Sequence, residues 1–321
     1  MNGASRLFLS VMFLAASCGG GGGSPPPPVT SSPTPTPTPT PSPTSSYVLN
    51  ADIRYGDGPT SGGSIPLLLD FYRPNQSCTV ARPTVVFVHG GGFVGGSRKG
   101  ANVTAIADEL APLGINLISI DYRLLGDNPL ISTEFADFER DYQAIGIGEP
   151  TERVRAFVAA VEDTVRALRW MASNADQYCI DAGRIGLWGS SAGAFTVLHA
   201  GYTLDTYGIS RPEPRVVVDY WGGLFQDTDL ETGEAPLFVM HGTADSTVSY
   251  SEATEITGRA ESVGVPFTFY SITGGEHDFQ GSGFFVLTVD GQSIARKTAT
   301  FVEAHLKDGG TPVYERRDIP R

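Results

Sequence analysis

The pentapeptide Gly189-Ser190-Ser191-Ala192-Gly193 constrains this chain more than any other feature. A short apolar run, Arg184–Trp188, precedes it, and a longer apolar run, Ala192–Leu204, follows it. The first run is typical of a buried strand and the second of a helix. Glycines two positions to either side of Ser191 leave room for a tight strand-to-helix turn. Because that turn holds a serine in strained geometry with its hydroxyl exposed, Ser191 is a better candidate nucleophile than Ser190.

A second glycine motif, His89-Gly90-Gly91-Gly92, follows the predicted strand Thr84–Val88. Consecutive glycines let backbone N–H groups approach a developing negative charge without obstruction by side chains. The expected oxyanion donors are the N–H groups of Gly91, Gly92 and Ala192. A flexible glycine loop without chemistry is the alternative that the motif alone leaves open.

A serine hydroxyl is a poor nucleophile until a base takes its proton. Among the five histidines, His277 is the candidate base because it follows the predicted strand Phe267–Ile272 in a loop. Asp245 follows the predicted strand Pro236–Met240 and is the candidate acid that orients the imidazole. A helix N-cap is the alternative role for Asp245. His241 precedes this acid in the chain, and three further carboxylates are rival acids: Asp219, Asp227 and Asp229.

Strand and helix patterns alternate along the chain after an initial predicted hairpin. The predicted strands are Tyr47–Tyr55, Ile65–Phe71, Thr84–Val88, Asn116–Asp121, Arg184–Trp188, Arg215–Asp219, Pro236–Met240 and Phe267–Ile272. The predicted helices are Ala101–Leu113, Thr151–Ala172, Ala192–Leu204, Ser251–Val263 and Ser293–Leu306. This alternation predicts an α/β fold with a mainly parallel central sheet and helices on both faces. Ligands of such sheets bind beyond the carboxyl ends of the strands, which is where each motif falls.

The first 46 residues are expected to lie outside this fold. Residues 1–18 have the layout of a signal peptide, with an apolar run too short to span a bilayer, and end in a lipobox-like Ala15-Ala16-Ser17-Cys18. Residues 19–46 form a Gly/Pro/Thr-rich disordered linker. Residues 47–321 are long enough for one catalytic domain. We expect an exported lipoprotein of a bacterial envelope, anchored through lipidated Cys18; cleavage near Ala16, giving a periplasmic or secreted protein, is the alternative.

The cysteines and the net charge of the chain indicate a disulfide and exclude some classes of partner. Cys78 and Cys179 precede strands that would be parallel neighbours, so we expect a disulfide between them, with two buried thiols as the alternative. The cysteines make no metal cluster. The net charge of −13 argues against nucleic acid or an anionic membrane surface as a partner.

Five ordered segments resemble the signatures of α/β-hydrolase carboxylesterases: His89–Phe93, Asp121–Leu124, Gly189–Gly193, His241–Val248 and Gly275–Phe279. The hormone-sensitive-lipase-like esterases and the bacterial acetyl-xylan or feruloyl-esterase-like proteins are the most similar groups. The resemblance implies the α/β-hydrolase fold and hydrolysis of carboxylic esters without metal or cofactor. It also implies a triad of Ser191, Asp245 and His277, an oxyanion hole of Gly91, Gly92 and Ala192, and structural positions for His89 and Asp121. Ser190 stands where the lipase-like group usually has an acidic residue, which leaves the substrate class open.

The sequence therefore predicts an exported serine esterase that forms an acyl-enzyme on a small-molecule or polysaccharide-linked ester. An amide or peptide hydrolase with the same triad, and a non-catalytic surface binding protein, are the alternatives. The insertion Leu125–Pro150 is expected to form one wall of an open cleft. Five aromatic residues could line that cleft or belong to the core: Phe93, Tyr122, Tyr220, Trp221 and Phe279. The sequence leaves the acyl group, the alcohol and the oligomeric state undetermined.

Overall fold

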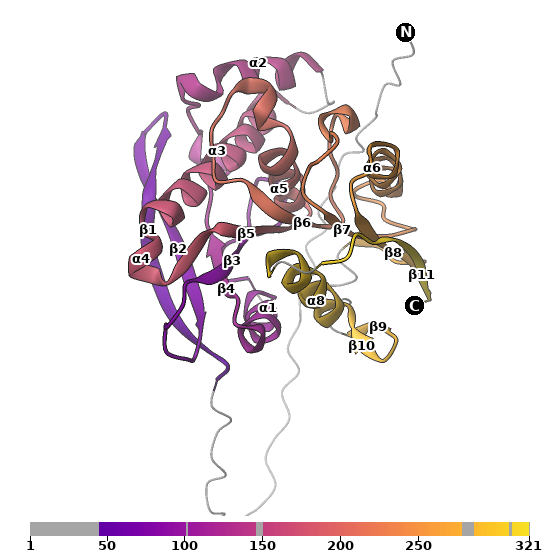
Figure 1. The fold of residues 1–321 in the computed structure, drawn as a ribbon. Helices are drawn as coiled ribbons and strands as arrows, with labels where there is room; N and C mark the ends of the chain where they lie inside the picture. The colour runs from indigo at the N-terminus through magenta and orange to yellow at the C-terminus, as the bar shows by residue number, and fades with distance from the viewer. Residues whose placement is uncertain (1–44, 101, 146–149, 278–285, 308–309, 321) are drawn as a thin grey trace, which may run out of the picture.

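The computed structural model describes residues 45–100, 102–145, 150–277, 286–307 and 310–320 (Figure 1). The expected signal peptide with Cys18, and the linker up to residue 44, lie outside the described residues, so export and lipidation stay predictions. In the described part of the chain, no helix is both long enough and apolar enough to cross a bilayer.

A nine-stranded sheet runs through the described domain in the order β1-β2-β4-β3-β5-β6-β7-β8-β11. Its strands are β1 (Tyr47–Thr60), β2 (Gly63–Pro74), β3 (Arg82–Val88), β4 (Asn116–Ile120), β5 (Ile180–Ser190), β6 (Pro214–Tyr220), β7 (Leu237–Gly242), β8 (Phe267–Thr273) and β11 (Tyr314–Pro320). A separate small hairpin joins β9 (Thr288–Val289) to β10 (Gln292–Ser293). The pairs β1–β2 and β2–β4 are antiparallel, and the pairs from β4 to β11 are parallel.

Helices cover both faces of this sheet, as Figure 1 shows. They are α1 (Val103–Leu110), α2 (Ala136–Ile145), α3 (Thr151–Ser173), α4 (Ala175–Tyr178), α5 (Ala192–Tyr202), α6 (Tyr250–Val263) and α8 (Ile294–Leu306). Alternate residues of β3 enter two separate cores: Val86 and Val88 face α3 and α5, while Val85 and Phe87 face α1 and α8. A strand buried on both faces needs a nearly continuous apolar sequence, which β3 has. The predicted α/β architecture is confirmed.

Helix α2 and strand β11 are among the elements that were not expected from the sequence. Helix α2 lies inside the predicted cleft-wall insertion and packs on α3, burying Phe138 and Tyr142. Strand β11 pairs in parallel with β8 at the edge of the sheet. Its sequence is rich in charged residues and mostly exposed. Charge suits an edge strand because it discourages pairing with other chains, but it hides the strand from a search for apolar runs.

The predicted helix Ala101–Leu113 is shorter in the structure. Its α-helical part is Val103–Leu110, and residues Ala111–Leu113 form a tighter 3₁₀ turn with Pro112 in it. Proline lacks the N–H that would continue the helical hydrogen bonding, which explains the change of geometry. The early hairpin, in contrast, is longer than expected.

The expected disulfide between Cys78 and Cys179 is present, with 6.1 Å between the two Cα atoms. The pairing follows from the sheet, because β3 and β5 are parallel neighbours and Arg82 pairs with Ile180 at their beginnings. The bridge closes a sequence separation of 101 residues. Such a closure restricts the unfolded chain, which is its main stabilising effect.

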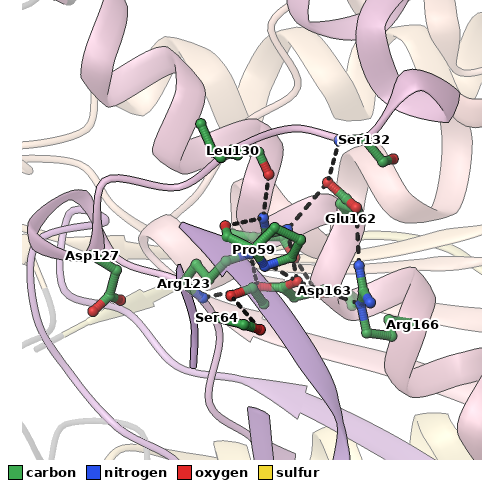
Figure 2. A network of polar contacts seen from close by, with 12 residues as sticks. Pro59, Ser64, Arg123, Asp127, Leu130, Ser132, Glu162, Asp163 and Arg166 are labelled. Carbon is green, nitrogen blue, oxygen red and sulfur yellow. Dashed lines mark hydrogen bonds and ion pairs between the residues drawn. The ribbon is translucent and has the colours of Figure 1, made fainter. Parts of the chain in front are cut away.

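A buried arginine ties the hairpin, the insertion and α3 together (Figure 2). Arg123 is fully buried, and its guanidinium donates to the Asp163 carboxylate at 2.8–3.1 Å. The same group donates to the carbonyl oxygens of Pro59 at 3.1 Å and Leu130 at 2.6 Å, and pairs with Glu162 at 3.1 Å. Since these partners come from three segments, namely β1, the insertion and α3, removal of the cation disturbs all three at once.

Arg123→Met should lower the free energy of unfolding by about 3–5 kcal/mol, because it leaves the Asp163 carboxylate buried without its cation. The double variant Arg123→Met/Asp163→Leu should regain part of the lost free energy of unfolding, since it removes the Asp163 anion together with the Arg123 cation. Urea unfolding followed by circular dichroism measures both. A loss below about 1 kcal/mol in the single variant would show that the ion pair does not hold these segments.

Candidate active site

Ser191 occupies a sharp turn between β5 and α5. Its backbone has φ 52° and ψ −123°, a region that side-chain-bearing residues rarely adopt. The Ser191 N–H donates to the Tyr220 carbonyl on β6 at 2.9 Å, and the Ser191 carbonyl accepts from the Ala194 and Phe195 N–H groups. The turn is therefore held by the neighbouring strand on one side and by the first turn of α5 on the other.

The two flanking glycines are required by close backbone contacts. A Cβ atom on Gly189 would lie 2.2 Å from the Gly193 carbonyl oxygen. A Cβ atom on Gly193 would lie 2.0 Å from the Val88 carbonyl oxygen at the end of β3. The start of α5 thus packs directly on the carboxyl ends of β5 and β3, which explains the glycine spacing around the serine.

The loop after β8 brings His277 to this serine. The distance from His277 Nε2 to Ser191 Oγ is 2.9 Å, and the distance from His277 Nδ1 to Asp245 Oδ2 is 2.7 Å. The Asp245 side chain is fully buried, while that of His277 is 18% exposed. The predicted residues thus form one hydrogen-bonded chain from a carboxylate through an imidazole to a hydroxyl.

The second oxygen of Asp245 holds the turn that carries it. Asp245 Oδ1 accepts from the N–H groups of Thr247 and Val248, both at 2.8 Å. Helix α6 has its own N-cap, Ser249, whose hydroxyl accepts from the Ser251 N–H. Asp245 therefore orders a local turn without being the N-cap of α6, which leaves Oδ2 directed at His277.

Electrostatics keep the Asp245 carboxyl ionised. Burial by itself would raise its pKa, but hydrogen bonds from His241 and His277, the charge of His277 and the Val248 N–H outweigh burial. The net result is a pKa well below the usual range for aspartate. An ionised acid at this position is suited to hold one tautomer of His277 and to stabilise its imidazolium form.

The glycine loop lies against the serine turn. A Cβ atom on Gly90 would come within 3.1 Å of Ser191 Cβ. Gly91 and Gly92 are exposed and have φ values of 127° and 61°, which only glycine adopts readily. Ala192 is the first residue of α5, where a backbone N–H has no acceptor within the helix. The expected oxyanion donors thus come from two segments that meet beside the candidate nucleophile.

Ring stacking and ion pairs of neighbouring residues hold the glycine loop in place. His89 stacks on Tyr122 with 4.3 Å between ring centroids, and the Tyr122 hydroxyl donates to the His89 carbonyl at 2.9 Å. Asp121 accepts from the Arg98 N–H at 2.8 Å, and the Arg98 guanidinium also binds Asp70 at 2.9 Å. His89 and Asp121 therefore have the structural roles expected of them. Arg98 was missed, although an arginine just after a glycine-rich loop is a visible signal.

Three of the other candidate residues have hydrogen-bond partners outside the proposed triad. Asp229 accepts from the Tyr142 hydroxyl at 3.3 Å. His199 is buried in α5 beside the Phe195 carbonyl, and burial lowers its pKa to about 3. Asp219 is fully buried and bonds to the Gly222 N–H.

Most of the aromatic residues considered for the cleft belong to the core. Phe93, Tyr122, Tyr220 and Trp221 are buried, and Phe279 lies outside the described residues. The Trp221 ring still approaches the His277 ring, with 6.2 Å between centroids. Among the described residues, no group of three or more His, Cys, Asp or Glu side chains is placed to hold a metal ion. The insertion as a cleft wall stays a hypothesis.

Known proteins share parts of this sequence and this fold. Residues 69–213 match the BD-FAE family model. Esterase LipC of Mycobacterium tuberculosis is 28% identical over 193 residues, which cover 59% of this chain and 40% of LipC. A segment of the non-reducing polyketide synthase Preu6 of Preussia isomera is 29% identical over 170 residues, covering 53% of this chain and 6% of the synthase. The aligned region is thus less than half of either relative.

Among solved structures, a truncated carbohydrate esterase from gut microbiota superposes with a TM-score of 0.58 at 17% identity, covering 82% of this chain and 98% of that protein. The fold and the site together define this chain as an α/β-hydrolase-fold protein. Within that class, its sequence is similar to the mycobacterial esterase LipC and matches the BD-FAE model over less than half of the chain.

Gly193→Ala should reduce hydrolysis of p-nitrophenyl acetate by about 100-fold or more, because the added Cβ displaces the serine turn from β3. Gly258→Ala is the matched control: nothing lies within 4 Å of its added Cβ in α6, and alanine favours the helix. Steady-state kinetics with a melting curve for each variant compare the two. Full activity in Gly193→Ala would mean that the close approach does not position the serine.

Proposed function

We propose that this chain is a serine esterase that hydrolyses carboxylic esters through an acyl-enzyme. The observation that carries the proposal is the hydrogen-bonded chain from Asp245 through His277 to Ser191. Two features support it: the glycine loop beside the serine, and the similarity of the sequence to esterases. A hydroxyl, a base, an orienting acid and nearby backbone donors are the groups that acyl transfer requires.

In the proposed mechanism, Ser191 Oγ attacks the acyl carbon while His277 Nε2 takes its proton. The N–H groups of Gly91, Gly92 and Ala192 stabilise the oxyanion. The His277 imidazolium then donates the proton to the departing alcohol, which leaves Ser191 acylated. A water molecule, deprotonated by His277, attacks the acyl carbon. The bond between that carbon and Ser191 Oγ then breaks, His277 returns the proton to Oγ, and the acid is released. Asp245 remains ionised throughout and stabilises the imidazolium.

We propose small or polysaccharide-linked esters as the substrate class. The carbohydrate esterase with the same fold and the esterase relatives support this choice. An amide or peptide hydrolase would use the same residues, so ester and amide substrates with one acyl group separate the two activities. Acetylated xylan and methyl ferulate, assayed beside p-nitrophenyl esters, separate polysaccharide-linked from simple esters.

Ser191→Ala should fold normally and lose p-nitrophenyl acetate hydrolysis by roughly 10³-fold or more, because it removes the hydroxyl that lies 2.9 Å from His277 Nε2. Ser190→Ala is the matched control and should retain most of the activity. A fluorophosphonate probe should label the wild-type and Ser190→Ala proteins but not Ser191→Ala. Absence of labelling in the wild type would favour the non-catalytic binding protein instead.

Activity should fall as the pH is lowered towards 4, because only an unprotonated His277 Nε2 can accept the proton of Ser191. Asp245 should add no second inflection down to pH 4, since its pKa is held below the usual range and it stays anionic. A profile of kcat/KM from pH 4 to pH 9 measures this. A flat profile down to pH 4 would rule out a histidine base.

A further inference from the structure

A second histidine and a second aspartate are buried near the proposed triad. The proposed mechanism does not use either of them. Asp219 and His241 are both fully buried at the carboxyl ends of the adjacent strands β6 and β7. Asp219 pairs with Val239, and His241 follows Val239 by two residues. Because successive side chains of a strand alternate between faces, Asp219 and His241 lie on the same face of the sheet.

One nitrogen of His241 reaches the acid of the triad. His241 Nε2 lies 3.0 Å from the Val248 carbonyl oxygen and 3.3 Å from Asp245 Oδ2. A carbonyl oxygen only accepts hydrogen bonds, so Nε2 carries a proton. Asp245 Oδ2 therefore faces two imidazole N–H groups, one from His277 and one from His241.

The other nitrogen of His241 requires a partner. In the part of the chain that the structure describes, buried His241 Nδ1 and buried Asp219 Oδ2 both lack a hydrogen-bond partner. With Nε2 protonated, a neutral ring would present a lone pair on Nδ1 near a carboxylate. A second proton on Nδ1 would turn that repulsion into attraction, because the charge of Asp219 acts on the His241 ring.

The surroundings of His241 supply no competing cation among the described groups that act on it. On β8, Ser271 pairs with His241 and its hydroxyl accepts from Tyr250. The Tyr250 ring lies 6.1 Å from the imidazole, centroid to centroid. On α6, the acidic side chain of Glu252 packs over Gly223. The charges that act on the ring are thus those of Asp219 and Asp245.

The direction of the pKa shifts agrees with a charged ring. Burial lowers the pKa of His241, but the hydrogen bond to Asp245 and the charge of Asp219 outweigh burial and raise it overall. Burial raises the pKa of Asp219 to about 6, against the opposing effect of the His241 charge. The raised pKa of His241 thus favours its charged form, and the charge of His241 in turn favours the ionised form of Asp219 against burial.

We propose that His241 is a positioning residue, held as an imidazolium between Asp219 and Asp245, that keeps the Asp245 carboxylate ionised and directed at His277. The inference rests on the proposed function of the triad and deepens it. His241 acts only through Asp245, and Asp219 acts only by keeping His241 charged. The proposal explains why two ionisable groups are buried at adjacent strand ends beside the catalytic acid.

The direct test is the charge on the ring, measured by ¹⁵N NMR of histidine-labelled protein at pH 7, with His241→Gln identifying the signal. We expect both ring nitrogens of His241 to be protonated in the wild type. In Asp219→Asn, only Nε2 should be protonated, because the counter-charge is gone. A wild-type ring protonated on Nε2 alone would overturn the proposal, whatever the activity of Ser191→Ala shows about the triad.

Kinetics separate positioning from a merely structural role. His241→Gln keeps a neutral donor near the Val248 carbonyl, and kcat should fall about 10-fold with little change in KM. The acid limb of kcat/KM should move to higher pH by about 0.5 unit or more, because the cation that shares Asp245 with His277 is removed. The double variant Asp219→Asn/His241→Gln should be no less active than His241→Gln, since both changes break one interaction.

His199→Gln is the control for these measurements, because it replaces another buried histidine that does not contact Asp245. The acid limb of the kcat/KM profile of His199→Gln should lie at the same pH as in the wild type. If His241→Gln loses activity and melting temperature while its acid limb does not move, then His241 only supports the fold and the proposal is wrong.

Discussion

The close approach of α5 to the ends of β5 and β3 is the contact on which the site depends. With no side chain at Gly193, the helix backbone comes so near to the Val88 carbonyl that a Cβ atom would lie 2.0 Å from it. This approach forces Ser191 into a positive φ and places the first N–H of α5 beside the glycine loop. The proposed nucleophile and oxyanion donors are thus positioned by backbone packing.

The electrostatics of the site depend on a second feature, the buried Asp245 carboxylate. Its burial would favour the neutral form, yet two backbone N–H groups and two histidine rings hold it ionised. Each oxygen has a separate task, one ordering the turn after β7 and the other facing His277. A carboxylate held in this way orients an imidazole without moving, which is the preorganisation that acyl transfer needs.

Much of the fold was predictable because buried parallel strands are nearly continuous apolar runs, as in Thr84–Val88. The disulfide followed once β3 and β5 were recognised as neighbours. Strand β11 was missed because an exposed edge strand tolerates charged residues. Helix α2 was missed because charged residues separate Phe138 and Tyr142 in a segment that reads as a polar loop. Arg98 was missed because its partners, Asp70 and Asp121, are distant in the sequence.

By itself the sequence determined which chemistry is available, since the glycine spacing around Ser191 and the order of the motifs are local properties of the chain. It could not decide the role of His241, which is separated from its partner Asp219 by a loop and a strand. Only the parallel pairing of β6 and β7 puts both on one face beside Asp245. Hydrogen bonds and charges act over a few ångströms, and only the folded sheet sets those distances.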